Sequence, residues 1–419
     1  MKVAHLMRKY DPAEWGGTET ALHRLCDGLH QCGVSSVVYC PQIPMGGQPD
    51  PLAEVGCEVK RFPACVPIWG IAPERRRQMV AVGGNLMSFR LIRELWQEPG
   101  LAVVHAHATG RIGAIGRMVA KHRRLPFLVS IHGGVYDLPA ALKQSLNAPE
   151  SQGWEWGKLC GILLRTRRIL SEADMIVTCN QREAALIHEH HPDQRVVVQP
   201  HGVPVHLYQN DHRGAARAAF PRLEGRSILL AVGRIDAVKN QGWLVEQMPE
   251  VFRRHPRLLL VLAGAATDQG YADALARRIG QIGMEKNVLL VGGLPPGDPR
   301  LIGLMQEARA VVLPSVSETF GLVILEAWAA GTAVISSRTT GAKSLVENGQ
   351  NGFLFDLEKP GELHAGIDEL WRSDTLADQM AAAGRKRVIA AFDTRVLAGR
   401  MKQLYENLIE EKHALCHPA

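Results

Sequence analysis

The sequence lacks several features that mark common classes of protein. No stretch approaches the roughly 20 consecutive apolar residues that cross a bilayer, and the opening stretch from Met1 to Met7 reads as a buried strand without a charged leader. The eight cysteines form no C-x-x-C pair and no regular framework in a chain of 419 residues. We therefore expect a cytoplasmic protein with reduced thiols, without a signal peptide or a membrane span.

The chain also has little excess charge. Its 48 basic and 42 acidic residues leave a net charge of +6, which suits phosphate-bearing ligands or an anionic membrane surface better than nucleic acid. The two basic clusters, residues 75–77 and 165–168, are not interleaved with the aromatic side chains on which bases stack. We expect no nucleic-acid partner.

Short apolar strands alternate with longer helical patterns along the chain, which is typical of a parallel sheet wrapped by helices. The rhythm restarts after Arg226, so we predict an α/β fold of two Rossmann-like, doubly wound domains that face each other across a cleft. The predicted parts are residues 1–205, residues 206–393 and a last helical segment, 394–419, that crosses back to the first domain. The predicted strands are 2–7, 36–40, 103–107, 127–132, 175–179, 196–199, 228–233, 258–264, 288–292, 310–314 and 332–336.

The strongest chemical signal follows the strand that ends at Pro314. Glu318 and Glu326 stand on either side of the helix start at Phe320, Gly321 and Leu322. Free backbone N–H groups at a helix start suit a phosphate, and Gly321 lets that phosphate approach closely. The two carboxylates can then accept hydrogen bonds from hydroxyls on either side of it. This arrangement resembles the E-x7-E signature of the family 4 retaining glycosyltransferases, the glycosyl transferases group 1 of the GT-B fold.

A second segment, Gly233 to Asn240, contains Arg234 and Lys239 after the first strand of the second domain. It resembles the same family's G-R-x-D-x-x-K motif, whose Arg and Lys neutralise the diphosphate of the sugar donor. Two cations can stabilise the negative charge that a leaving diphosphate gains. We interpret Asp236 as structural.

In the first domain the resemblance implies roles for glycines and histidines at strand ends. Gly16 and Gly17 follow the opening strand and precede a helix, and Gly17 resembles the glycine that leaves room for the donor diphosphate. His132 resembles the histidine that approaches the donor sugar near the reaction centre. The second-tier candidates His105 and His107 resemble an H-x-H stretch that lines the cleft.

The resemblance also implies a contact with the nucleotide base and no requirement for a metal. The backbone at Leu294 is expected beside the base of the nucleotide. No D-x-D pair occurs in the sequence, so the metal-chelating device of the other large glycosyltransferase fold is missing. We expect no metal and no cofactor besides the nucleotide sugar. His201, where the family usually has asparagine, leaves the acceptor side less defined.

The implied function is retaining transfer of a sugar from a nucleotide diphosphate, with UDP the most frequent in the family, to a glycan, lipid-linked or small-molecule acceptor. Surface-polysaccharide or glycoconjugate synthesis is the expected setting. The alternatives are a sugar-nucleotide 2-epimerase of the same fold and a non-catalytic nucleotide-sugar-binding protein. The segment from Gly153 to Leu170 has two interpretations: a peripheral contact with the inner membrane or a lipid-linked acceptor, and a buried core helix with a solvated basic end. We favour the buried helix because the stretch is short.

Overall fold

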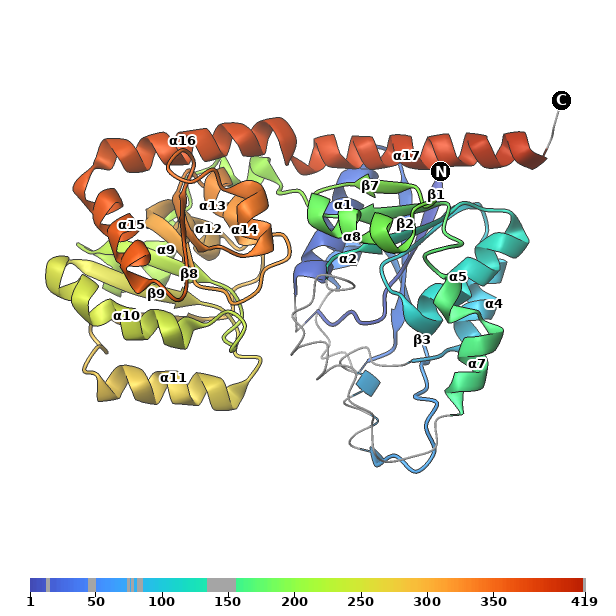
Figure 1. The fold of residues 1–419 in the computed structure, drawn as a ribbon, viewed down its shortest axis with the longest axis horizontal. Coiled ribbons are helices and arrows are strands. Elements are labelled where there is room, and N and C mark those ends of the chain that lie inside the picture. The colour runs from blue at the N-terminus through green and yellow to red at the C-terminus, as the bar shows by residue number, and fades with distance from the viewer. Residues whose placement is uncertain are drawn as a thin grey trace. The chain divides into compact units, whose positions relative to one another are not determined.

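The chain forms two compact units, each built on its own parallel sheet (Figure 1). Unit 1 comprises Met1–His201 and Thr394–Ala419, and unit 2 comprises Gly202–Asp393. This computed structural model describes residues 1–12, 16–43, 50–73, 76, 79–80, 86–133 and 156–416.

The sheet of unit 1 has the strand order β3-β2-β1-β4-β5-β6-β7, and every neighbouring pair is parallel. The order runs outward in both directions from β1 and β4, so the topology reverses between these two strands. The strands are β1 (Lys2–Leu6), β2 (Ser35–Pro41), β3 (Glu58–Phe62), β4 (Leu101–Ala106), β5 (Phe127–Ile131), β6 (Met175–Thr178) and β7 (Val196–Val198).

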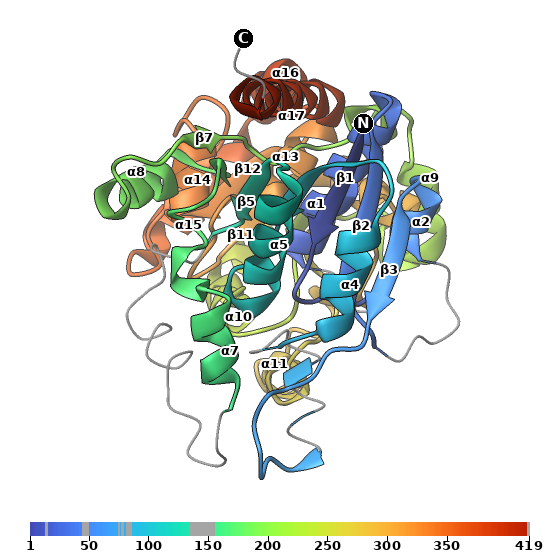
Figure 2. The ribbon, with the colours of Figure 1, turned by 90° about the vertical axis from the view of Figure 1, so that its right-hand side faces the viewer.

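Helices cover both faces of this sheet, so its central strands are apolar on both sides. Successive residues of a strand point to opposite faces. In β1, Leu6 packs with the core that includes Ile115 of α5, whereas Val3 packs with Leu29 of α1 and Met401 of α17. Figure 2 looks onto the face that α4 and α5 cover. Within the described residues, the helices of unit 1 with complete bounds are α1 (Gly17–Gln31), α2 (Pro51–Glu54), α4 (Phe89–Gln97), α5 (Gly110–Arg123), α7 (Gly157–Leu163), α8 (Gln181–His190) and α17 (Thr394–Cys416).

The sheet of unit 2 has the order β10-β9-β8-β11-β12-β13, again with every neighbouring pair parallel. Its topology reverses between β8 and β11. Strand β9 is buried along its whole length, as expected for a central strand with helices on both sides. The strands are β8 (Ser227–Val232), β9 (Leu258–Ala263), β10 (Val288–Gly292), β11 (Ala308–Leu313), β12 (Ala333–Ser337) and β13 (Phe353–Phe355).

Helices α10, α11 and α15 pack on one core of unit 2, around Leu244, Leu275 and Leu363. Helix α13 is apolar nearly all round and buries Trp328 completely, as a helix packed on several sides requires. The helices of unit 2 are α9 (Arg213–Ala219), α10 (Gln241–Arg254), α11 (Gln269–Gln281), α12 (Pro299–Glu307), α13 (Leu322–Ala329), α14 (Thr340–Leu345), α15 (Pro360–Arg372) and α16 (Asp374–Ala391).

The predicted α/β fold of two doubly wound domains is confirmed, and each of the 11 predicted strands coincides with an observed one. The edge strands β3 and β13 were not predicted from the sequence. In β3 only Phe62 is fully buried, and β13 is three residues long. Partly exposed or very short strands carry too few apolar residues to be recognised by hydrophobic pattern.

The interpretation of the segment before Leu170 as a buried helix is wrong for its central part. Of that segment, the structure describes residues 156–170, where α7 leaves Leu159, Ile162 and Leu163 exposed by 64%, 72% and 74%. Among the described apolar side chains of this stretch, Leu164, Ile169 and Leu170 are buried. In the described ranges, no helix is both long enough and apolar enough to cross a bilayer.

Candidate functional site: strand ends in both units

Both parallel sheets reverse their strand order near the middle, and ligands of such sheets bind beyond the carboxyl ends of the strands at that point. In unit 2 the loops concerned follow β8 and β11, and in unit 1 they follow β1 and β4. The predicted residues Arg234, Lys239 and Glu318 lie on the two loops of unit 2. His107 lies on one of the loops of unit 1.

The loop after β8 is organised by Asp236. Its Oδ1 accepts hydrogen bonds from the backbone N–H groups of Val238, at 3.0 Å, and Lys239, at 2.9 Å. Its Oδ2 lies 3.3 Å from the Nη2 of Arg234. A short carboxylate that bonds the backbone two and three residues ahead fixes a tight turn. Asp236 therefore fixes the turn that leads to Lys239 and pairs with the Arg234 side chain.

The loop after β11 carries Glu318 to meet Lys239. The Lys239 ammonium and the Glu318 carboxylate form an ion pair, with 19% and 21% of the side chains exposed. The two loops are also joined through the backbone, because the N–H of Val316 donates to the carbonyl of Val238 at 2.8 Å. The structure thus brings two of the predicted catalytic residues into direct contact.

Helix α13 begins directly after this loop. Gly321 is its N-cap residue, with φ at +93°, a left-handed conformation that favours glycine. A Cβ at Gly321 would lie 2.9 Å from Cδ1 of Ile324. Phe320 is buried before the helix, and Leu322 is its first residue. In the first turn of α13 the N–H of Ile324 donates to the carbonyl of Gly321 at 3.0 Å. The N–H groups that precede it come before the first bond of the helix, and such groups suit an anion.

Glu326 and Leu294 occupy different places in unit 2. Glu326 is buried in α13, more than one turn after Gly321. Leu294 is half-buried after β10, and β9 separates β10 from β8. Leu294 therefore lies two strands away from the strand that leads to Lys239. A ligand that reaches both must extend along the carboxyl edge of the sheet.

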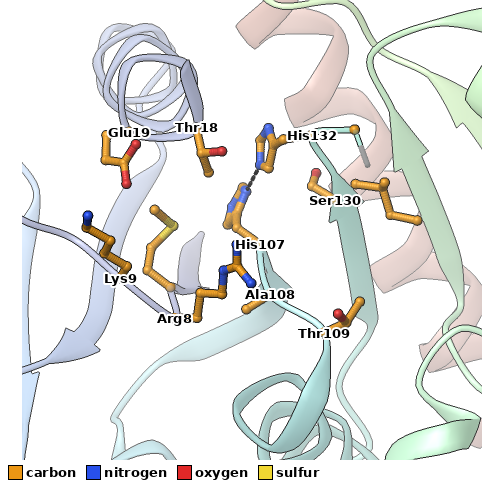
Figure 3. Close-up of a pocket in the computed structure, with 12 residues that line it drawn as sticks. Arg8, Lys9, Thr18, Glu19, His107, Ala108, Thr109, Ser130 and His132 are labelled. Carbon is orange, nitrogen blue, oxygen red and sulfur yellow. Dashed lines mark hydrogen bonds between the residues drawn. The ribbon is translucent and has the colours of Figure 1, made fainter. Parts of the chain in front are cut away.

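Unit 1 has a pocket at its own point of strand reversal (Figure 3). Four segments contribute to it: the residues after β1, the first turn of α1, the residues after β4 and the end of β5. The lining residues are Met7, Arg8, Lys9, Thr18, Glu19, His107, Ala108, Thr109, Ser130, Ile131, His132 and Gly133. Hydroxyl, imidazole, carboxylate and cationic groups therefore meet in one cavity, as in sites for polar ligands.

The predicted glycines border this pocket. Gly16 caps α1, and its N–H donates to Oε2 of Glu19 at 3.1 Å. Gly17 is the first residue of α1 and is exposed. A Cβ at Gly17 would meet none of the described residues within 4 Å, so the described part of unit 1 does not require glycine there. Trp15, which precedes Gly16, and Gly134, which follows Gly133, lie outside the described residues.

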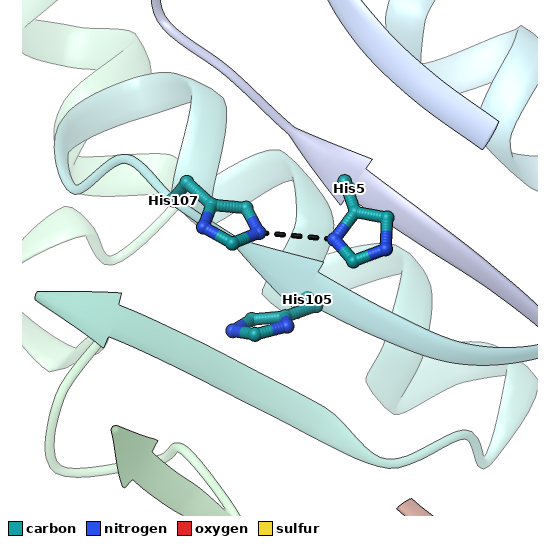
Figure 4. Close-up of side chains that lie close together, drawn as sticks. All are labelled: His5, His105 and His107. Atoms are coloured by element: carbon teal, nitrogen blue, oxygen red, sulfur yellow. Dashed lines mark hydrogen bonds between the residues drawn. The ribbon is translucent and has the colours of Figure 1, made fainter. Parts of the chain in front are cut away.

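The predicted histidines lie together because of strand register. His5 of β1 and His105 of β4 are register partners in neighbouring parallel strands, so they point to the same face of the sheet. His107 is two residues beyond His105 and shares that face (Figure 4). His132, after β5, is hydrogen-bonded to His107. Nδ1 of His107 lies 2.9 Å from Nε2 of His132. His105 binds Ser130 and Tyr405 at 2.7 Å each.

Burial keeps these imidazoles neutral. Desolvation lowers the pKa of His5 to about 3 and that of His132 to about 4. It also lowers the pKa values of His105, His107 and His201 well below the usual value. Burial disfavours the charged form of an imidazole, so near neutral pH these side chains act as hydrogen-bonding groups rather than as cations.

Several residues that line the unit 1 pocket were not predicted from the sequence. Arg8 and Lys9 follow the opening strand directly, and Thr109 follows β4. The rule that ligands bind beyond strand ends could have identified them. His5 had no comparable signal, because it lies inside a strand and a single histidine in a strand gives no pattern.

Comparisons with known proteins match both halves of the chain to glycosyltransferase families. Residues 16–202 match the glycosyl transferase 4-like domain, and residues 213–387 match glycosyl transferases group 1. The D-inositol 3-phosphate glycosyltransferase of Nocardia farcinica is 32% identical over 63% of this chain, which spans 57% of that relative's length. The enzyme of the same name from Frankia alni is 30% identical over 75% of this chain and 77% of its own length.

The fold is also found among solved structures. Anabaena Alr3699/HepE, in complex with UDP and glucose, superimposes with a TM-score of 0.73 at 18% identity, covering 97% of this chain and 99% of its own. At that identity the likeness concerns the fold alone, which is the GT-B arrangement of two parallel-sheet domains. The sequence matches and the fold agree, and the chain belongs to the glycosyl transferases group 1 family.

Proposed function

We propose that this glycosyltransferase transfers a sugar from a nucleotide diphosphate, with UDP the first candidate, to an acceptor hydroxyl with retention of anomeric configuration. The observation that carries the proposal is the grouping in unit 2 of Lys239, Glu318 and Arg234 with the start of α13 at Gly321. Two cations and a helix N-terminus offer a site for a diphosphate.

In this reaction the bond between the anomeric carbon and the β-phosphate oxygen breaks, and the diphosphate gains negative charge. Lys239 and Arg234 stabilise that charge without a metal ion. The acceptor oxygen bonds to the anomeric carbon on the same face, and its proton passes to the leaving phosphate. Glu318 binds sugar hydroxyls and Glu326 binds the ribose, while the backbone at Leu294 contacts the base.

The pocket of unit 1 supports a polar acceptor. Arg8 is exposed at its rim, and a guanidinium recognises phosphate well. Two of the relatives compared carry the name D-inositol 3-phosphate glycosyltransferase. We therefore propose a phosphorylated polyol as the first small-molecule acceptor to test, beside glycan and lipid-linked acceptors of surface-polysaccharide or glycoconjugate synthesis.

We further propose that the enzyme works in the cytoplasm and touches the inner membrane through α7. Exposed Leu159, Ile162 and Leu163 stand between the exposed cations Lys158 and Arg165, a combination that favours an anionic lipid surface. Vesicle flotation should retain the protein on anionic vesicles and release it when the three apolar residues are replaced by serine. Equal flotation of the triple variant would contradict the contact.

The experiment that tests the function begins with a thermal-shift panel of nucleoside diphosphates. A nucleotide at 100 times its dissociation constant adds about 2.7 kcal/mol to the stability of the folded state, so the base that raises Tm identifies the donor class. The matching nucleotide sugar is then incubated with acceptors, and NMR of the product reports the anomer. An inverted product contradicts retention. An epimerised nucleotide sugar without acceptor indicates a 2-epimerase, and binding without turnover indicates a non-catalytic protein.

A further inference from the structure

A buried glutamine closes the loop that carries the two cations of unit 2. Arg234 and Lys239 lie on the loop after β8, and Gln241 is the first residue of α10, directly beyond that loop. The side-chain Nε2 of Gln241 donates to the backbone carbonyl of Arg234 at 2.8 Å. This bond joins the end of the loop to its start, so both cations lie within a closed ring of the chain.

The orientation of the Gln241 amide follows from its partner. A carbonyl oxygen can only accept a hydrogen bond, and in a glutamine side chain only the NH2 group donates. Nε2 therefore faces Arg234, and Oε1 is left without this contact. Oε1 is buried, and although the structure describes every residue of unit 2, none of them donates to it.

A buried amide oxygen without a donor destabilises a fold, because it has lost its hydrogen bonds to water. Gln241 is only 3% exposed. An unbranched apolar side chain such as methionine would fill a comparable volume without this penalty. Packing alone therefore does not favour glutamine at this position, and what glutamine adds is the hydrogen bond to Arg234.

The peptide group between Arg234 and Ile235 is held on both sides. Its N–H donates to the carbonyl of Ala265, after β9, at 2.8 Å, and its C=O accepts the bond from Gln241. Together the two bonds fix the plane of this peptide group, and with it the direction in which the Arg234 side chain leaves the backbone. With the bond to Gln241 removed, the plane can tilt about the remaining one.

Gln241 can hold this peptide group because its own neighbours are fixed. Nδ2 of Asn240 donates to the carbonyl of Pro314, just after β11, at 3.2 Å. The N–H of Gly242 donates to the hydroxyl of Tyr271 in α11 at 2.9 Å. The start of α10 is therefore tied to two other elements of unit 2, and the Gln241 amide extends that fixed position to the start of the loop.

We propose that Gln241 is a positioning residue, which fixes the peptide group of Arg234 so that the guanidinium meets the diphosphate of the sugar donor. The identity of that diphosphate rests on the proposed function. The Arg234 side chain is 49% exposed, and its ion pair is with Asp236 of the same loop, so that ion pair does not place the loop within unit 2. A cation held in advance stabilises the developing charge without reorganisation, and the effect of Gln241 therefore falls more on turnover than on affinity.

Gln199, which follows β7 in unit 1, is a matched control. It is 6% exposed, its Nε2 donates to the carbonyl of Leu397 at 2.7 Å, and its buried Oε1 makes no hydrogen bond with the described residues. The two glutamines thus share their burial and their bonding. They differ in what they hold, since Gln199 joins a strand end to α17 and Gln241 holds the Arg234 loop. A purely structural role predicts the same behaviour for both.

The experiment compares Gln241→Met with Gln199→Met by Tm, steady-state kinetics and calorimetric titration with nucleoside diphosphate. Both variants should fold with similar changes in Tm, because each loses one neutral hydrogen bond and one buried unpaired oxygen. Gln241→Met alone should lose about fivefold to tenfold in turnover, the effect of one neutral hydrogen bond, and about twofold to threefold in affinity. Equal turnover and affinity in the two variants would overturn the proposal. If Gln241→Met and Gln241→Leu both fail to fold while Gln199→Met folds, Gln241 has a structural role and the proposal is wrong.

A double variant tests whether Gln241 acts through Arg234. In the Arg234→Ala background no guanidinium remains to be positioned, so Gln241→Met should cause little further loss of turnover or of nucleotide affinity. Losses that multiply as for independent sites would contradict the positioning role. If the wild type binds nucleoside diphosphate but transfers no sugar, the proposed function fails, and the same comparison of affinities decides the role of Gln241 by itself. A wild type that binds no nucleoside diphosphate would overturn both.

Discussion

Lys239 and Glu318 form an ion pair that joins the loops after β8 and β11 in unit 2. The ammonium that is proposed to meet the donor diphosphate is thus held by a carboxylate that is proposed to bind sugar hydroxyls. Asp236 fixes the backbone of Lys239 from the other side. Both charged groups are already oriented, and little reorganisation is needed when the diphosphate gains charge.

Lys239→Ala should fold normally, bind nucleoside diphosphate somewhat less well and lose about 10²–10³ in turnover. The loss falls mainly on turnover because the charge of the diphosphate is greatest in the transition state. Arg234→Ala should behave alike, and the double variant should be less than additive. Steady-state kinetics with calorimetry measures both quantities. Arg254→Ala, which breaks the ion pair with Asp368, is the control and should keep its turnover; wild-type turnover in Lys239→Ala would refute the diphosphate site.

Gly321→Ala should weaken nucleotide binding, because the added Cβ crowds the start of α13 where a phosphate would bind. The left-handed backbone should also cost about 1 kcal/mol of stability. Gly349→Ala is a matched control, because Gly349 has φ at +81° and a Cβ there would meet none of the described residues within 4 Å. It should lose similar stability and keep nucleotide affinity. Equal affinity in both variants would remove Gly321 from the binding site.

Glu326→Ala should lower nucleotide affinity by about 1.5–3 kcal/mol, the value of a hydrogen bond to a charged group. Calorimetric titration of the folded variant measures the loss. Glu307→Ala serves as the control, since Glu307 is a mostly buried carboxylate at the end of α12 that pairs with Arg217. If Glu326→Ala binds nucleotide as the wild type does, the ribose contact lies elsewhere.

Transfer should proceed without a divalent cation, because Lys239 and Arg234 supply the positive charge that a metal supplies in D-x-D enzymes. Initial rates with and without EDTA measure this. An Mg²⁺ titration controls for effects of ionic strength. Activity that EDTA abolishes and Mn²⁺ restores would contradict the proposal.

Stability should fall on mild acidification. The pKa values of His5 and His132 are about 3 and about 4 in the folded protein, below the value of about 6.5 for an unfolded chain. The unfolded state therefore binds more protons below pH 6.5, and stability that is complete above that pH is lost toward pH 4. Each such histidine contributes up to about 1.4 kcal/mol per pH unit.

Urea unfolding at pH 8, 7, 6 and 5 measures how the free energy of unfolding changes with pH. His5→Leu removes one buried histidine, so this slope should decrease by up to about 1.4 kcal/mol per pH unit. The contribution of Glu98 can be told apart from that of the histidines by its pH range. Its pKa is lowered to about 2 by Lys2, Lys60 and Tyr39 against the opposing effect of burial, so its effect on stability appears only below about pH 4.5. Constant stability from pH 7 to pH 5 would be inconsistent with neutral buried histidines.

The sequence predicted the features that depend on local pattern. Lys239, Glu318 and Gly321 were identified because motif residues follow apolar strands, and the structure has them after β8 and β11. It could not predict that Lys239 pairs with Glu318, since 79 residues separate them. The hydrogen bonds that His105 makes with Ser130 and His107 makes with His132 likewise depend on the register of β4 against β5. Exposure of α7 depends on what packs against it, which periodicity alone does not reveal.

The division of unit 1 between the two ends of the chain has a consequence for synthesis on the ribosome. The core that contains Val3, Val103 and Leu128 is completed by Met401 and Tyr405 of α17. Translation proceeds at roughly 5–20 residues per second, so residues 202–419 take about 10–40 s to follow. During that interval the face of the first sheet that α17 later covers exposes its apolar side chains. We expect a chaperone that binds apolar surface to bind the nascent chain at this face.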